Sequence, residues 1–274
     1  MTTTIPPQKF PRVISPRPDP LATRRPRHPG LPCLVLAVCI AAAGSSALAI
    51  PQPRALQYRV AWNGIPAASA TVEITPAQID GRESLIIKAT AGTNRFVDLF
   101  WTFRGTVRST LRAADLTPVE FVYDRHMAGK PYRTRIDFER HSARSVYVRG
   151  SHRQESAIDG PDLIDPITAI FRARASGARP GDTLSYDVWT GESRFRVKLA
   201  VGQPEPIEVP AGRFRALRIV PEVWKIGATR ELDTRLRTAT IWVSDDPSRT
   251  ILRIRSDIFI GAVTVDLVSA VRAA

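Results

Sequence analysis

Three histidines and one pair of neighbouring carboxylates are the residues after position 50 whose side chains suit acid–base chemistry. They are His126, His141 and His152, with Asp245 and Asp246. A hydrolase built from them would need a histidine within hydrogen-bond reach of a carboxylate, directly or through one water molecule. The histidines lack His-x-His and His-x-x-x-His spacing, so a shared metal site would require convergence in the fold.

Other catalytic arrangements have less support. The sequence has no Gly-x-Ser-x-Gly elbow and no Gly-rich phosphate loop, and both cysteines, Cys33 and Cys39, precede residue 50. Asp245-Asp246-Pro247 has the composition of a turn, and neighbours on a strand point to opposite faces, which argues against a carboxylate dyad. We therefore expect no catalytic residue, no metal and no cofactor. A hydrolase acting on envelope polymers through Asp245 or Asp246 remains the alternative.

Five tryptophans are many for a chain of 274 residues. Aromatic rings that line a half-barrel could hold an acyl chain or another apolar ligand, although the same rings could simply fill the core. The residues expected to line such a ligand site are Trp62, Trp101, Ile170, Phe171 and Trp189.

Arginine dominates the charge of the chain, which has 39 basic against 26 acidic residues and a formal charge of +13. Several arginines alternate with apolar neighbours, which places each pair on one strand face: 133 and 135, 194 and 196, 235 and 237, 253 and 255. Such a face either binds an anionic envelope component, such as lipid headgroups or lipopolysaccharide phosphates, or is an ordinary solvated surface. No nucleic-acid-binding motif is present, so nucleic acid is not an expected partner.

Strand signals fill most of the chain after residue 55. Apolar residues alternate with polar ones over 56–62 and 68–74 on either side of Asn63-Gly64, which predicts a hairpin. Turns are also expected at Asp80-Gly81, at Ala128-Gly129-Lys130-Pro131, near Ser142 and at Gly191-Glu192. Further strands are predicted over 85–89, around 107, and over 119–123, 132–138, 146–148, 184–189, 195–201, 214–224, 234–243, 250–255 and 258–271, about a dozen in all.

Two helices are expected among these strands. Thr93-Asn94 reads as the cap of a short apolar piece that contains Phe96, Leu99 and Phe100. Asp165 is a good N-cap and Pro166 suits the first helical position, which predicts the principal helix. Its apolar residues at helical spacing are Ile167, Ile170 and Phe171.

The fold class follows from the short turns between consecutive strands, which favour antiparallel pairing. The pattern predicts a mainly β fold: a single curved antiparallel sheet or open β-barrel, with the principal helix packed on its concave face. The composition, 43% hydrophobic and 24% charged, is that of a folded protein. No run of about 18 strongly apolar residues follows position 50, so the exported domain is not expected to span a membrane.

The first 49 residues are typical of an export signal. A basic region with Arg24, Arg25 and Arg27 precedes an apolar core over 34–43, and Ala47-Leu48-Ala49 has the small residues of a cleavage site. We expect a signal peptide over 1–49, cleavage after Ala49, and one exported domain over 50–274 in the periplasm. The alternative is an uncleaved N-terminal anchor in the inner membrane.

An ordered series of short motifs resembles the bacterial envelope family DUF3108. The motifs are Val209–Phe214, Ile241–Asp246, Ile258–Val263 with Asp266–Val268, Asp165–Phe171 with Pro180–Asp182, and the first hairpin with Trp62 and Gly64. The resemblance implies an exported, mostly β domain from a Gram-negative bacterium, with no established reaction and no catalytic residues to transfer. Gly212 and Gly261 are then expected at positions that need positive φ or close approach of the backbone.

These observations predict a non-enzymatic periplasmic protein that binds an apolar or amphiphilic envelope ligand such as a lipid. Besides the hydrolase, a third hypothesis is a structural partner of another envelope protein, which would dock on an exposed sheet edge or on the basic face.

Overall fold

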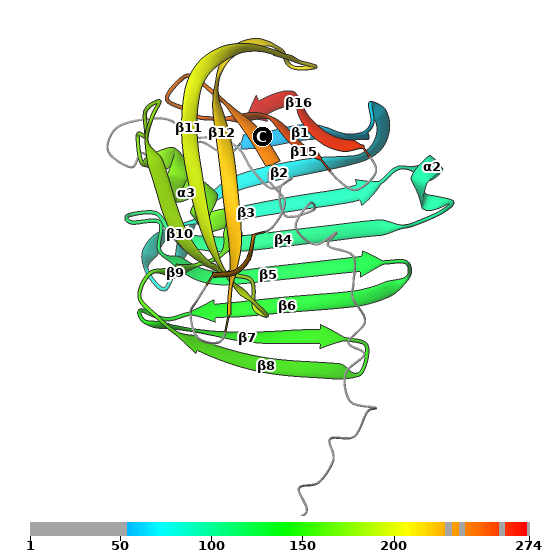
Figure 1. The fold of residues 1–274 in the computed structure, drawn as a ribbon. Helices are drawn as coiled ribbons and strands as arrows, with labels where there is room; N and C mark the ends of the chain where they lie inside the picture. The colour runs from blue at the N-terminus through cyan, green and yellow to red at the C-terminus, as the bar shows by residue number, and fades with distance from the viewer. Residues whose placement is uncertain (1–53, 228–231, 236–238, 258–260, 273–274) are drawn as a thin grey trace, which may run out of the picture. The chain divides into compact units, whose positions relative to one another are not determined.

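The computed structural model describes residues 54–227, 232–235, 239–257 and 261–272 (Figure 1). The predicted signal peptide, its cleavage after Ala49, and the cysteines Cys33 and Cys39 all lie outside these residues. Within the described ranges, none of the helices has both the length and the apolar character required to cross a bilayer.

The described chain contains sixteen strands and two short helices. The strands are β1 (Arg54–Trp62), β2 (Ile65–Ile79), β3 (Arg82–Thr93), β4 (Phe103–Arg112), β5 (Pro118–Met127), β6 (Lys130–Phe138), β7 (Ser142–Arg149), β8 (His152–Asp159), β9 (Leu163–Ile164), β10 (Thr183–Trp189), β11 (Arg194–Val209), β12 (Gly212–Ile226), β13 (Leu232–Arg235), β14 (Ala239–Ser244), β15 (Ile251–Asp257) and β16 (Ala262–Arg272). The helices are α2 (Arg95–Asp98) and α3 (Pro166–Ala175).

All the strands belong to one sheet, whose order is β8 to β1 followed by β16, β15, β14, β12, β11, β10 and β9. Strand β13 lies off this path and pairs with β12. Pairing of β1 with β16 joins the two runs of the chain. The sheet ends at β8 and β9, which are consecutive in sequence but not paired, so it is an open sheet, as expected.

One connection departs from the antiparallel pattern. Strand β9 is parallel to β10, with Leu163 opposite Asp187, and α3 forms the crossover between them. A parallel pair needs a connection of a dozen or more residues, and the chain between Ile164 and Thr183 supplies it. The helix that the sequence predicts therefore lies in the crossover that allows β9 and β10 to run parallel.

Positive φ angles confirm the predicted turns at Asn63-Gly64 and Asp80-Gly81, whereas Lys130 and Pro131, which were expected in a turn, belong to β6. Asn63 and Gly64 have φ values of 48° and 82°, the pair of positive angles that a two-residue hairpin turn requires. Gly261 has φ +82°, and a Cβ there would lie 1.9 Å from Asn63 Oδ1, which accepts a hydrogen bond from the Ala262 amide at 2.8 Å. Gly212 has φ +129°. Both glycines thus occupy positions of the expected kind.

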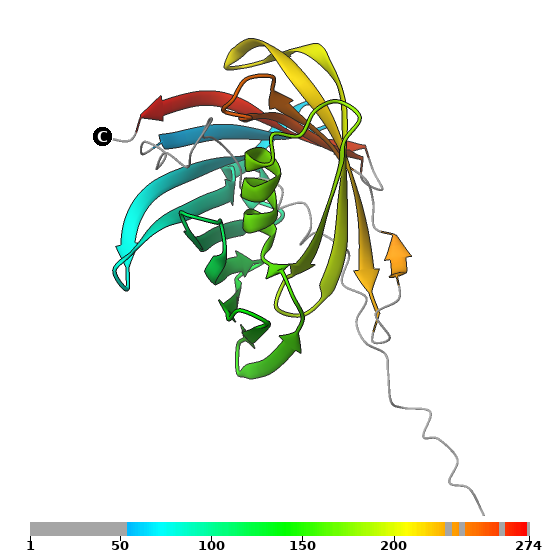
Figure 2. The same cartoon turned by 90° about the vertical axis from the view of Figure 1, so that its left-hand side faces the viewer.

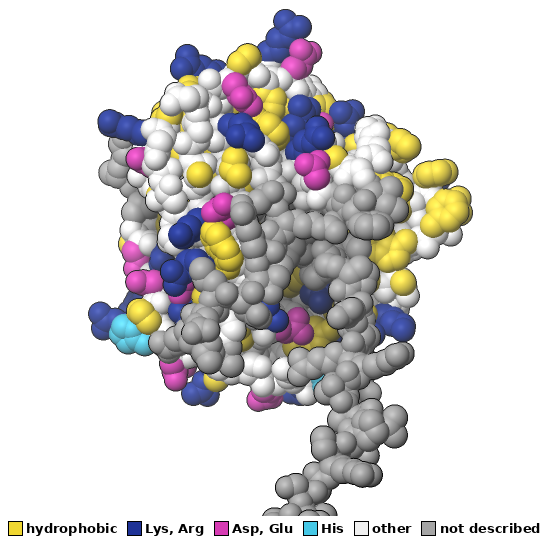
Figure 3. Space-filling view, in the orientation of Figure 1, with side chains coloured by type: hydrophobic (Ala, Val, Ile, Leu, Met, Phe, Trp, Pro, Cys, Tyr) yellow, Lys and Arg dark blue, Asp and Glu magenta, His cyan; other side chains and the backbone are white. Residues whose placement is uncertain are grey.

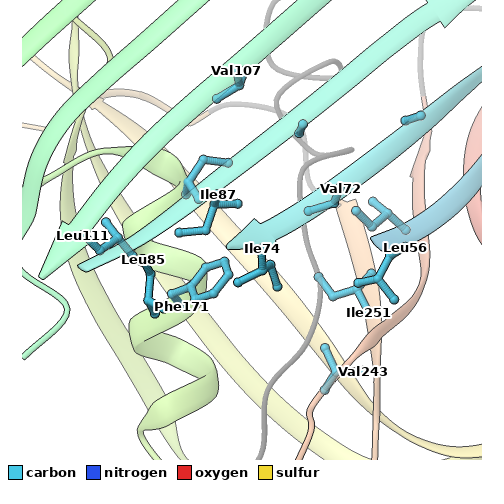
Figure 4. Close-up of a cluster of buried hydrophobic side chains, with 14 of the residues drawn as sticks. Leu56, Val72, Ile74, Leu85, Ile87, Val107, Leu111, Phe171, Val243 and Ile251 are labelled. Carbon is cyan, nitrogen blue, oxygen red and sulfur yellow. The ribbon is translucent and has the colours of Figure 1, made fainter. Parts of the chain in front are cut away.

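Helix α3 packs on the inner face of the curved sheet, as predicted. Asp165 caps it, and its Oδ1 accepts hydrogen bonds from the Ile167 and Thr168 amides at 2.8 and 3.0 Å. Ile167 and Phe171 are buried in the main core, and Ile170 packs against that core. Figure 2 shows α3 between the cyan and green strands of the first run and the yellow strands β11 and β12, and in Figure 4 Phe171 lies beside Leu85 and Ile74.

Two strands were not expected from the sequence, namely β8 and β9, and the single strand expected over 234–243 overlaps both β13 and β14. Strand β8 has exposed or half-exposed residues throughout, because it is an edge strand with little to bury. Strand β9 has two residues, which is too short for a periodic signal.

Candidate functional site

The five residues expected to line a ligand site occupy different environments. Trp62 ends β1 and is 44% exposed. Trp101 follows α2 and stacks on Phe103 with ring centroids 5.9 Å apart. Phe171 and Trp189 are buried in the main core, and Ile170 packs against it. Three of the five therefore contribute to close packing of the core, and the described structure does not gather all five into one wall.

A shallow hollow of about 310 Å³ lies over strands β2 to β5 and contains none of these five residues. Thr71, Thr90 and Thr106 follow one another across the strands of this hollow, on the face opposite the buried Val72, Ala89 and Val107. The hollow is thus on the outer face, and its hydroxyl groups give no indication of a specific ligand.

A more informative group of side chains lies on the inner face of β5, β6 and β7. We call it the arginine–tyrosine cluster, and it consists of Tyr123, Arg125, Tyr132, Tyr147 and Arg149. Tyr132 is directly opposite both arginines in the strand register. The Arg125 guanidinium carbon is 4.8 Å from the Tyr123 ring centroid and 5.1 Å from that of Tyr132, and the Arg149 carbon is 5.3 Å from Tyr132. Two cations therefore share one aromatic ring.

Arg125 is the unusual member of the cluster, because only 9% of it is exposed. Its Nε has no hydrogen-bond acceptor, and no carboxylate within the described ranges forms an ion pair with it. Arginine is rarely buried without an anionic partner, since removal of the charge from water is costly. The two tyrosine rings offset part of this cost through cation–π contacts.

Tyr147 completes the electrostatic description of the cluster. Burial raises the pKa of its hydroxyl, and the exposed carboxylate of Glu192 acts in the same direction. The positive charges of Arg125 and Arg149 oppose this shift. The Tyr147 hydroxyl therefore stays protonated at neutral pH and can donate a hydrogen bond to an anion.

The hairpin turn between β10 and β11 packs against the same inner face. Gly191 has φ +91°, and a Cβ there would lie 2.6 Å from Thr134 Cγ2, so this position requires glycine. The Ser145 hydroxyl donates to the Gly191 carbonyl at 2.5 Å. At the end of β10 the buried Trp189 Nε1 has no acceptor within the described ranges. The cluster thus has a rigid neighbour on one side.

The residues of the hydrolase hypothesis are engaged elsewhere. Asp245 forms ion pairs with Arg215 at 3.0 Å and Arg249 at 3.1 Å. Asp246 accepts hydrogen bonds from the Ser244 hydroxyl and the Ser248 amide at 3.0 and 2.7 Å, and these bonds lower its pKa against the effect of burial.

The three histidines, His126, His141 and His152, are exposed. Across the described ranges, the structure shows no hydrogen bond or ion pair between a histidine and Asp245 or Asp246. It also shows no group of three or more histidine, cysteine or acidic side chains arranged to hold a metal.

The alternating arginines form ion pairs rather than a bare basic face. Arg133 pairs with Asp124, Arg135 with Glu120 and Asp137, Arg194 and Arg196 with Asp187, Arg253 with Asp266, and Arg255 with Asp257. The side chains of residues 235 and 237 lie outside the part of the structure that is described. An external anion would have to compete with these carboxylates.

Sequence reasoning missed Arg125, although a signal for it exists. Phe121, Tyr123 and Arg125 alternate with Val122 and Asp124, so the arginine shares a face with two large aromatic residues. A charged residue at a core-facing position is the exception that suggests a function.

A family model matches most of the described part of the chain. The family model described as a protein of unknown function, DUF3108, matches residues 57–268. The chain belongs to the DUF3108 family. No curated protein matches the sequence. A β-barrel-like DUF1849 protein from Brucella abortus has 7% identity and a TM-score of 0.54, covering 81% of this chain and 98% of its own, so the DUF3108 domain shares that fold.

Two further solved structures are more distant from the DUF3108 chain. A candidate exported protein of Bacteroides fragilis with a YmcC-like fold has 9% identity and a TM-score of 0.34, covering 85% of this chain and 99% of its own. A candidate lipoprotein of Parabacteroides distasonis has 10% identity and a TM-score of 0.34, covering 81% and 96%. At these scores they do not support an inference about function.

Proposed function

We propose that this DUF3108 protein is an exported, non-enzymatic binding protein of the cell envelope that holds an amphiphile with an anionic head group. The observation that carries the proposal is the buried guanidinium of Arg125, which lacks a carboxylate partner among the described residues. Export rests on the signal pattern of residues 1–49.

An anionic head group supplies what Arg125 lacks. Carboxylate and phosphate oxygens match the fork of a guanidinium, and such charge-assisted hydrogen bonds are roughly twice as strong as neutral ones. Arg149 lies over the same Tyr132 ring, so an anion near that ring would also reduce the repulsion between the two cations. The Tyr147 hydroxyl is a further donor on this face.

The apolar part of the ligand has a matching surface beside the cluster. Gly105 is directly opposite Arg125 in the register and carries no side chain, and the Phe103 ring packs over it. Trp101 extends this aromatic surface by stacking on Phe103. Because Phe103 itself is buried, a chain that leaves the cluster along β4 would contact the partly exposed Trp101 ring, whereas α3 packs into the core on the other side of the interior.

Native mass spectrometry of protein isolated from the envelope without detergent tests the proposal, and we expect a co-purified amphiphile. The direct probe is palmitate, with hexadecanol as an uncharged analogue of equal chain length. Palmitate should raise the melting temperature and hexadecanol should not, because the anion is what Arg125 recognises.

Arg125→Met is the decisive variant, with Arg135→Met as its matched control. Arg135 lies on the outer face of β6 and pairs with Glu120 and Asp137. We expect Arg125→Met to abolish the palmitate effect and to leave the free protein as stable or more stable, because an apolar side chain of similar volume replaces an unpaired buried charge. The control should keep the palmitate effect.

Two results would refute the proposal. One is a protein that carries no amphiphile after native isolation and does not respond to palmitate. The other is an Arg125→Met variant that loses stability without any change in palmitate affinity, which would make the cluster a purely structural contact.

A further inference from the structure

Helix α2 presents large apolar side chains to solvent, and none of its residues is buried. Phe96, Leu99 and Phe100 are 62%, 77% and 80% exposed. Ile65 and Trp62, from the neighbouring β1–β2 hairpin, are 59% and 44% exposed. We call these five residues the aromatic tip. In Figure 3 the apolar side chains gather at the edge where Figure 1 labels α2.

The tip is held in place by polar contacts beneath it. The Asn94 amide donates to the Ala67 carbonyl at 2.9 Å, its side-chain nitrogen donates to the Pro66 carbonyl at 2.7 Å, and its Oδ1 accepts from the Val97 amide at 2.9 Å. The Phe96 and Phe100 rings meet edge to face, with centroids 5.9 Å apart. The exposure of these rings is therefore fixed by the local structure.

A second clamp joins α2 to β4. Arg104 donates to both carboxylate oxygens of Asp98, at 3.0 and 2.6 Å, and these hydrogen bonds lower the pKa of Asp98. The same contact neutralises the charge of Asp98. Arg95 on α2 and Lys130 at the β5–β6 turn are exposed and form no ion pair with a carboxylate in the described ranges. The edge that carries the tip therefore has an excess of positive charge.

We propose that the aromatic tip is a membrane-docking surface that inserts into the headgroup region of an anionic lipid bilayer. Trp favours the membrane–water interface, exposed Phe and Leu side chains insert into the boundary between headgroups and acyl chains, and each nearby cation adds attraction to anionic lipids. Protein partners of stable complexes typically contribute about 20–30 residues a side, far more than the five side chains of the tip. A protruding apolar tip with uncompensated cations suits a lipid surface better than a flat protein partner.

The tip and the arginine–tyrosine cluster share one edge of the sheet. Arg149 is the last residue of β7, and Arg125 lies two residues before Met127, where β5 ends next to the β5–β6 turn. A docked bilayer would therefore lie beside the cluster. The docking inference does not depend on ligand binding at Arg125, because its observations come from α2 and the hairpin next to it.

A fluorophore on the tip tests insertion directly, whether or not the N-terminal segment is cleaved. In the full chain with Cys33→Ala and Cys39→Ala, Leu99→Cys is labelled with an environment-sensitive dye. Gln78→Cys, exposed at the opposite edge of the sheet, is the matched control. With vesicles of phosphatidylethanolamine and phosphatidylglycerol, we expect a blue shift and quenching by brominated acyl chains at position 99 only.

Variants in the labelled background separate the apolar and charged contributions. Phe96→Ser with Phe100→Ser should weaken insertion about tenfold or more, because two rings that leave water on insertion are lost. Arg95→Gln with Lys130→Gln should reduce insertion at low salt and flatten its dependence on ionic strength. Val268→Ser with Val271→Ser removes exposed apolar residues of β16 and should leave insertion unchanged.

Four outcomes would overturn the inference. The dye at position 99 could stay unquenched by brominated lipid, or the dyes at positions 99 and 78 could be quenched alike. Equal insertion into neutral phosphatidylcholine vesicles would contradict the assignment to an anionic surface. A dimer in light scattering that the Phe96→Ser, Phe100→Ser variant abolishes would make the tip an interface between copies of this chain.

Discussion

Helices α2 and α3 are built from similar local signals and have opposite surroundings. Each begins at a side chain that caps the first turn, Asn94 in α2 and Asp165 in α3. Each is accompanied by three large apolar residues, which are Phe96, Leu99 and Phe100 in one case and Ile167, Ile170 and Phe171 in the other. The residues of α3 are buried in or packed against the core, whereas those of α2 are exposed.

The contrast shows that apolar residues near a capped turn can be either buried in the core or exposed to solvent. Helix α3 lies in the crossover from β9 to β10, so the chain must carry it across the inner face of the sheet. Helix α2 connects two adjacent antiparallel strands at their ends, and among the described elements no second layer buries its residues. Position in the topology therefore decides which helix is buried.

Paired truncations of phenylalanine should give the largest difference between the helices. Phe171→Ala is expected to lower the free energy of unfolding by about 3–5 kcal/mol, because it leaves a cavity in the core. Phe96→Ala should change it by less than about 0.5 kcal/mol, as is usual for an exposed site. Urea denaturation measures both, and similar losses in the two variants would contradict the contrast.

Loss of the caps should give a smaller difference with the same sign. Asp165→Ala removes the acceptor of the Ile167 and Thr168 amides and of the buried Ser109 and Thr168 hydroxyls, so we expect a loss of about 2 kcal/mol or more. Asn94→Ala should cost about 1 kcal/mol or less, since water can replace its contacts. An equal cost in urea denaturation would show that α2 is more important for stability than its exposure indicates.

The two helices should respond to pH in opposite directions. Complete burial raises the pKa of Asp165 above 3.8, although hydrogen bonds from Thr168, Ser109 and Ile167 oppose the shift. Its contribution to stability is present below pH 3.8 and is lost as the pH rises through the folded pKa. The stability of the wild type relative to Asp165→Asn should therefore fall as the pH rises above 3.8.

For Asp98 the hydrogen bonds from Arg104 and Thr93 lower the pKa below 3.8. Its contribution is present above pH 3.8 and is lost as the pH falls through the folded pKa. Thermal unfolding of the wild type, Asp165→Asn and Asp98→Asn over a pH series measures both effects, and two slopes of the same sign would refute the assignment.

The smallest effect is expected for Arg104→Gln, which opens the clamp on α2. Because solvent screens exposed ion pairs, the free energy of unfolding should hardly change. Amide hydrogen exchange of residues 95–101 should become faster, since Asp98 loses its ion pair and keeps only the hydrogen bond from Thr93. Unchanged exchange would show that Asn94 alone holds the tip, and Arg108→Gln, which breaks a similar exposed pair with Glu120, is the control.

Much of the fold could be predicted, because its determinants are local. The Asn63-Gly64 turn, the alternation on either side of it, and the cap at Asp165 each depend on a few neighbouring residues. Strand β8 was missed because an edge strand buries little, and the parallel pairing of β9 with β10 was missed because no short segment encodes it.

The candidate site was harder to predict than the fold. Phe171 was expected beside a ligand, and the structure places it in the packed core with Leu85 and Ile74. Arg125 was overlooked, because a sequence shows which strand face a residue lies on but not what lies across from that face. The exposure of Trp62, Phe96 and Phe100 could not be predicted either, because burial depends on whether another element covers the residue.

By itself the sequence determined the β meander, its turns and the caps of both helices, because alternation, positive φ and capping are properties of short segments. The tertiary structure decided that β1 pairs with β16, that α3 covers the inner face, and that Arg125 is buried while Phe100 is not. These features depend on contacts between segments far apart in the chain, and only the assembled sheet determines which side chains lose their water.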